Sequence, residues 1–213
     1  MKKRFLALTA LIIFITSCGP KIYKTEDFSD KTSSHKIVAI LPTEVNIQLR
    51  PNEMKKTTPE QLAQSQETTG KDIQDKMYSW FLKRSNKFKY TVTFQDISKT
   101  NALLSKAGIT YSTMATKTKE EICQLLGVDA VISSRASMKK PMSDGAAVAV
   151  GLIAGAWGPT NDVQTSISIN EGKKGDLIWK YDYNASGSVG SSTDMLVDGL
   201  MRNASKKFPY NSK

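Results

Sequence analysis

The chain has 213 residues, of which 39% are hydrophobic and 23% charged, and its formal net charge at pH 7 is +10. This length suffices for one ordinary domain with a buried core, and the basic balance either favours an anionic partner or simply keeps the domain soluble. The chain has two cysteines, too few for a disulfide framework. It has one histidine, His35, which makes a zinc site and a histidine-based catalytic triad unexpected.

The first predicted element is an export leader. Three basic residues at positions 2–4 precede an apolar run over residues 5–15, a pattern typical of a secretory signal. The run is too short to cross a bilayer comfortably, because a spanning helix needs about 20 apolar residues. An uncleaved anchor and an ordinary secretory signal are the alternatives.

The leader ends in Ile-Thr-Ser-Cys at residues 15–18, which resembles the lipobox of bacterial lipoproteins. The resemblance implies that residues 1–17 are removed as a lipoprotein signal peptide and that Cys18 is acylated. Loss of three basic residues and no acidic residue would lower the net charge from +10 to +7. Gly19 after the cysteine favours the outer membrane, because the aspartate associated with inner-membrane retention is absent.

The residues after the leader are predicted as a tether and then one domain. Residues 18–34 are polar and predict a flexible tether, and residues 35–213 form the expected periplasmic domain. Residues 36–42 are a continuous apolar run that ends at a proline, which predicts a central buried strand. Residues 43–58 are polar and predict a loop.

Helices and short strands are then expected in alternation. Thr58 and Pro59 provide an N-cap and a first helical residue for a helix over residues 59–83. Further along the chain, the pattern predicts a strand over 90–94, a helix over 96–108 capped by Asp96, a helix over 117–126 that stops at Gly127, and a last helix over 192–208.

Three strands lie in the second half of the chain. Residues 129–138 form the first, and residues 163–170 and 177–184 alternate cleanly as a hairpin joined by a loop over 171–176. Such alternation means one buried face and one face that is wet or covered by a partner. The core face of the last strand is expected to hold Leu177, Trp179, Tyr181 and Tyr183.

These elements predict an α/β fold with α+β character. We expect a single domain in which helices pack on a mixed sheet of about five strands, with a carboxy-terminal antiparallel hairpin. The layout resembles a group of envelope lipoproteins that includes the curli-secretion channel lipoprotein and the activators of penicillin-binding proteins. The stretches that carry the resemblance are residues 37–42, 126–132 and 175–180, and the closing helix with Phe208 and Pro209.

The resemblance implies a scaffold and not an enzyme, because members oligomerise, build secretion pores or contact a partner enzyme. The chain departs from the curli channel pattern in lacking a pair of long alternating inserts, which argues against a large pore. An apolar Gly/Ala-rich insert over residues 145–158 instead offers a membrane-facing or partner-facing tip. Its alternative is a buried loop or helix packed on the sheet. The candidate contact residues are Val148, Val150, Leu152, Ile153 and Trp157.

Other motifs favour structural roles. The serine–lysine spacing of penicillin-recognising enzymes occurs twice, at Ser33-x-x-Lys36 and Ser137-x-x-Lys140, and we interpret both matches as chance. Cys123 is predicted to be a small buried apolar residue. Residues 83–90 mix basic and aromatic side chains, which suits either a nucleic-acid surface or a solvated helix end. Export favours the helix end, so we expect no nucleic acid. We also expect no metal, no cofactor and no small-molecule substrate, because the sequence has no His/Cys cluster with metal spacing, no phosphate-binding loop and no catalytic carboxylate pair.

The sequence therefore predicts a lipid-anchored, non-enzymatic scaffold or interaction module at the outer membrane. Its expected partners are membrane lipid, through acylated Cys18, and an envelope protein or a second copy of the chain. The contact surface is expected on the hairpin over residues 163–183 and the apolar insert before it. The alternative is an oligomeric pore or secretion component whose 145–158 segment enters the membrane, and an envelope enzyme is the third hypothesis.

Overall fold

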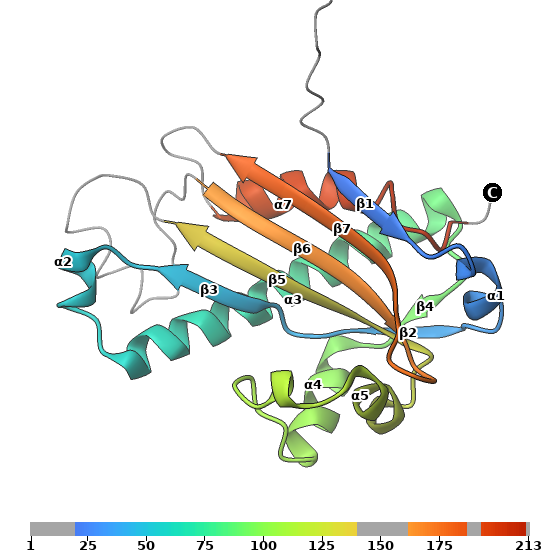
Figure 1. The fold of residues 1–213 in the computed structure, drawn as a ribbon, viewed down its shortest axis with the longest axis horizontal. Helices are drawn as coiled ribbons and strands as arrows, with labels where there is room; N and C mark the ends of the chain where they lie inside the picture. Colours follow the sequence, from blue (N-terminus) through green and yellow to red (C-terminus); the bar gives the residue numbers. More distant parts are fainter. Residues whose placement is uncertain (1–19, 140–161, 187–192, 212–213) are drawn as a thin grey trace, which may run out of the picture.

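A mixed sheet of seven strands organises the computed structural model, which describes residues 20–139, 162–186 and 193–211 (Figure 1). The strands are β1 (Lys21–Lys24), β2 (Ile37–Ile40), β3 (Glu44–Gln48), β4 (Thr93–Phe94), β5 (Ala130–Lys139), β6 (Asp162–Glu171) and β7 (Leu177–Ser186). The helices are α1 (Phe28–Thr32), α2 (Pro51–Met54), α3 (Pro59–Phe88), α4 (Ile97–Lys106), α5 (Lys119–Leu126) and α7 (Thr193–Ala204), with a 3₁₀ turn at Met114–Thr116.

The strands run in the order β1-β7-β6-β5-β2-β4, and β3 continues beside β5 beyond β2. The pairs β2–β4, β2–β5 and β3–β5 are parallel, whereas the pairs β5–β6, β6–β7 and β1–β7 are antiparallel. The parallel pairs belong to crossover connections through helices, and β6 and β7 form the predicted hairpin. The expected α/β class and the mixed sheet are confirmed, and the sheet has seven strands where about five were expected.

Helices cover the sheet unequally. Helices α3 and α7 pack behind the sheet in Figure 1, and their apolar side chains form one continuous core with β5, β6 and β7. Helices α4 and α5 lie at the lower side of the molecule and cover a smaller second core around Val131 and Leu41. No helix crosses the front of β6 and β7, so one face of the hairpin is open among the described residues.

Local sequence signals explain where the helices begin and end. Thr58 and Thr118 each accept a hydrogen bond from the third helical amide of α3 and α5, and Asp96 accepts two at the start of α4. These bonds satisfy amides that have no partner inside a helix. Gly127 closes α5 with a φ of 64°, a conformation that glycine adopts without a steric penalty.

Two predictions before α3 need correction. The predicted loop over residues 43–58 contains β3 and α2, because Val45 and Ile47 alternate with polar residues and enter the core. The segment 18–34, predicted as a tether, contains β1 and α1, and Phe28 is buried against Tyr210. The described fold therefore reaches further toward the amino terminus than the predicted boundary at residue 35.

Three further differences concern Leu177, the last helix and strand β4. Leu177 does not face the core but is 38% exposed, because an irregularity between Ile169 and Asn170 places the extra residue Ile178 in the core. The last helix ends at Ala204, and Phe208 reaches the core from the segment after it. Strand β4 is also shorter than predicted, since residues 90–92 lie outside it.

Candidate functional site

The residues expected to touch membrane or partner lie outside the described residues: Cys18, Val148, Val150, Leu152, Ile153 and Trp157. The structure does place both ends of the connection that holds the 145–158 insert. Lys139 of β5 and Asp162 of β6 are direct partners in the sheet, so residues 140–161 leave and rejoin it at one position. Two paired strand ends are usually joined by two to five residues.

The open sheet face is the part of the predicted contact surface that the structure describes. We define it by the outward residues of β5, β6 and β7, which are Ser133, Arg135, Ser137, Gln164, Ser166, Ser168, Lys180, Asp182 and Asn184. All are polar, and none is fully buried. Their neighbours in sequence, such as Ile167 and Tyr181, are fully buried on the opposite face. The predicted alternation of the hairpin is therefore present except at Leu177.

A shallow hollow of about 460 Å³ lies on this face beside the start of α5. Arg135 bonds Glu44 at 2.8 Å across its rim, and Lys180 bonds Asp182 at 3.0 Å. Burial lowers the pKa of Lys119, which lines the hollow, and the nearby Glu44 carboxylate opposes that shift. Exposed ion pairs of this kind contribute little to stability, so these side chains are free to exchange partners.

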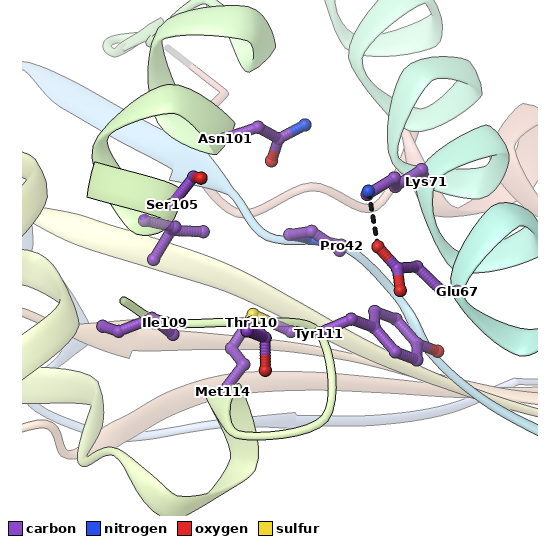
Figure 2. Close-up of a pocket in the computed structure, with 10 residues that line it drawn as sticks. Pro42, Glu67, Lys71, Asn101, Ser105, Ile109, Thr110, Tyr111 and Met114 are labelled. Atoms are coloured by element: carbon purple, nitrogen blue, oxygen red, sulfur yellow. Dashed lines mark hydrogen bonds and ion pairs between the residues drawn. The ribbon is translucent and has the colours of Figure 1, made fainter. Parts of the chain in front are cut away.

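A second concavity, a cleft of about 280 Å³, opens where β2 ends (Figure 2). Pro42 lies at its floor, α3 supplies Glu67 and Lys71, and α4 supplies Asn101 and Ser105. The carboxyl ends of parallel strands are the usual place for ligand clefts in open α/β sheets. Sequence reasoning missed this cleft, because its lining comes from segments that only the fold brings together.

The polar groups around this cleft already bind one another. Lys71 Nζ contacts Glu67 Oε1 at 2.6 Å, and the side-chain amides of Asn101 and Gln74 exchange two hydrogen bonds. The Tyr111 hydroxyl donates to the Thr43 carbonyl and accepts from the Val45 amide, each at 2.8 Å. These bonds hold the junction between β2 and β3 in place, so the cleft has the character of a structural joint.

The described residues assemble no catalytic constellation. His35 is buried against the Tyr210 hydroxyl at 2.8 Å, and burial lowers its pKa, while the Asp129 and Glu171 carboxylates oppose the shift. Cys123 is buried as predicted, and burial raises the pKa of its thiol to about 12, which keeps it protonated and unreactive. No group of metal-ligating side chains and no membrane-crossing helix is found among the described residues.

Comparison with known proteins places the chain only through its fold. No protein-family model and no curated protein sequence matches it. Its structure is similar to that of lipoprotein GNA1162 from Neisseria meningitidis, with a TM-score of 0.42 and 12% identity over 80% of this chain and 94% of that one. The LpoB C-terminal domain from Salmonella enterica gives a TM-score of 0.34 with 12% identity over 75% of this chain and 93% of that one.

A PelC dodecamer from Paraburkholderia phytofirmans gives a TM-score of 0.42 with 8% identity over 92% of this chain and 98% of that one. These neighbours match the group of envelope lipoproteins that the sequence resembles. At identities of 8–12% and TM-scores of 0.34–0.42 the likeness is limited to the fold.

Proposed function

We propose that this chain is a lipid-anchored protein of the bacterial cell envelope, whose domain is a non-enzymatic interaction module at the periplasmic side of the outer membrane. One observation carries the proposal. Strand β1 begins at Lys21, three positions after the cysteine of the lipobox-like sequence. An acylated Cys18 would therefore hold the edge of the sheet within about 11 Å of extended chain from the bilayer.

The open sheet face is the surface that we propose for a protein partner. It is built on three long paired strands, which makes it rigid, and its serine, glutamine and asparagine side chains can donate and accept hydrogen bonds. Apart from Leu177, which lines its hollow, the described side chains on this face are polar, which suits a partner that binds and leaves, because permanent interfaces are more hydrophobic. The partner is another envelope protein or a second copy of this chain.

Mass spectrometry of the exported protein tests the anchor. We expect residues 1–17 to be absent and Cys18 to carry fatty acyl chains, and the protein to fractionate with membranes. The variant Cys18→Ser should lose both the acyl mass and the membrane fraction. Cys123→Ser is the matched control, because Cys123 is buried in the core and should leave the anchor unchanged. An unmodified Cys18 or an intact leader would contradict the proposal.

Site-specific cross-linking tests the interaction surface. A photoreactive residue at Ser166, on the open face, should capture a partner or a second copy in intact cells, whereas one at Lys106 on α4 should not. Size measurement of the native protein in detergent then separates a self-oligomer from a complex with another protein. Equal capture from both positions would mean that the open face has no special role.

A second candidate function is an oligomeric pore or secretion component. The pairing of Lys139 with Asp162 favours it, because a connection as long as residues 140–161 is far more than the hairpin needs. Its apolar 145–158 stretch would then enter the membrane. Deleting residues 145–158 should leave the unfolding transition of the domain intact and abolish assembly or membrane permeation. Unfolding of the deletion variant would show that the segment belongs to the core.

A further inference from the structure

A basic cluster lies where the end of α3 meets the segment after α7. Its exposed members are Lys83, Lys87, Lys89, Arg202, Lys206 and Lys207. Beneath them Arg84 is half-buried, and its guanidinium lies over the rings of Trp80 and Phe88 at 5.2 and 5.8 Å. Lys83 also lies over Trp80, at 5.3 Å. The two aromatic rings thus support two of the cationic side chains.

Tertiary contacts bring the two halves of this cluster together. The Tyr90 hydroxyl donates to the Ser205 carbonyl at 2.7 Å, and the Phe208 ring packs on Tyr90 and Phe81 with centroids 5.0 and 4.6 Å apart. Trp80 donates to Asp198 of α7 at 3.0 Å. Residues 83–89 and 202–207 therefore form one surface, although more than a hundred positions separate them in the sequence.

One acidic residue, Asp198, lies beside the cluster, where its carboxylate accepts the Trp80 N–H. The sequence has no aspartate or glutamate between Asp75 and Asp96 or after Asp198. Among the described residues, none of the seven cations forms an ion pair. Together with Arg84 the cluster carries seven charges, which equals the whole net charge of +7 expected for the chain without its leader. The remaining residues of that chain hold equal numbers of basic and acidic side chains.

The position of this cluster points to one occupant, on the basis of the lipid anchor proposed above. Strand β1 and helix α7 lie along the same upper side of the molecule in Figure 1, while α4 and α5 lie on the lower side. Lys24 of β1 lies over Phe28, and Phe28 packs on Tyr210, two residues beyond the core residue Phe208. The anchored edge therefore connects to the segment that carries Lys206 and Lys207 through a chain of ring contacts over Phe28, Tyr210 and Phe208.

We propose that the basic cluster docks on the anionic phosphate headgroups of the membrane that anchors the chain. The domain then lies against the bilayer along β1 and α7 and presents the hairpin to partners. Lipid chains combined with a basic patch are a recurrent means of fixing a protein to a membrane, and each lysine near an anionic surface strengthens attachment roughly fivefold. The attraction must weaken at high ionic strength, because salt screens exposed charges.

Lysine footprinting of the native lipidated protein tests this docking without any variant. The full chain is reconstituted into vesicles of phosphatidylcholine, with or without phosphatidylglycerol, and treated with an impermeant amine reagent before peptide mass spectrometry. We expect Lys83, Lys87, Lys206 and Lys207 to be protected in the anionic vesicles and to become reactive again at high salt. The matched controls Lys99, Lys106 and Lys117 are exposed on the α4 side and should react equally under all conditions.

A charge variant sharpens the same measurement. Lys206→Gln with Lys207→Gln should lower the ratio of docked to undocked domain roughly 25-fold, whereas Lys106→Gln with Lys117→Gln should leave it unchanged. Equal reactivity of cluster and control lysines in anionic vesicles would overturn the docking. It would also be overturned if soluble polyphosphate protected the cluster lysines while anionic vesicles did not. A protein that does not partition into any vesicle and lacks acyl chains would overturn the anchor, and the docking with it.

Discussion

The two faces of the hairpin of β6 and β7 carry opposite chemistry on the same strands. Trp179 and Tyr181 are 1% and 0% exposed and pack in the core with α7 and Phe208. Lys180 and Asp182, which alternate with them along β7, lie on the open face and form an ion pair. The buried face decides whether the chain folds, because it holds most of the apolar area of the hairpin. The side chains of the open face contribute little to stability, so their identity can serve binding without impairing folding.

Removal of a large core side chain should show the largest difference between the faces. Trp179→Ala is expected to lower the free energy of unfolding by about 4 kcal/mol, because it leaves a cavity that the sheet cannot close. Lys180→Ala, the neighbouring residue on the open face, should change it by less than about 0.5 kcal/mol. Urea unfolding followed by circular dichroism measures both. Similar decreases in the free energy of unfolding for both variants would mean that Lys180 is buried by another part of the protein or by a second copy.

The close approach of α3 to the sheet gives the next largest effect. A Cβ atom on Gly70 would lie 2.3 Å from the Thr43 carbonyl and 2.7 Å from the Tyr111 ring. Gly70→Ala is therefore expected to cost about 2 kcal/mol in the free energy of unfolding, as overpacking does. Gly199→Ala in α7 meets no atom within 4 Å and should be neutral or slightly stabilising. If both variants were equally stable, the joint at Thr43 would be looser than the structure indicates.

A helix cap that supports the smaller core should have a moderate effect. Asp96 accepts hydrogen bonds from the amides of Ser98 and Lys99 at 2.9 and 3.1 Å. Asp96→Ala should lower the free energy of unfolding by about 1 kcal/mol, since those amides lose their partner. Lys99→Ala in the same helix is the control and should stay within about 0.5 kcal/mol. A thermal or urea unfolding curve distinguishes the two variants.

Acidification should produce the smallest effect, through the buried His35. Burial lowers the pKa of this imidazole below its ordinary value of 6.5, so the unfolded chain binds the proton more readily than the folded one. Stability should therefore fall as the pH drops through 6.5 and continue to fall until the lower folded pKa is passed. Urea midpoints above and below pH 6.5 measure this loss, and His35→Gln should remove it. An unchanged slope in that variant would assign the loss to other groups.

Local patterns predicted most of the fold. The caps at Thr58 and Asp96 and the glycine at Gly127 mark boundaries that the structure confirms, because capping is a short-range interaction between neighbours in sequence. The helix predicted over 117–126 instead begins at Lys119, and Thr118 caps it. Alternation along residues 163–170 likewise identified β6 and its buried face. The same alternation in β3 is too short to stand out, and that strand exists because β5 provides a partner.

Surfaces assembled from distant segments could not be read from the chain in this way. Residues 83–90 look like an ordinary solvated helix end, and only the packing of Phe208 and Tyr90 places Lys206 and Lys207 beside them. Phe28 similarly lies in a segment whose composition predicts a polar linker, and only the packing around β1 and β7 shows that its ring is part of the core. Helix ends and strand faces depend on neighbours along the chain and are visible in the residues. Register, bulges and charged patches depend on which segments meet, and the packing of the whole core sets that choice.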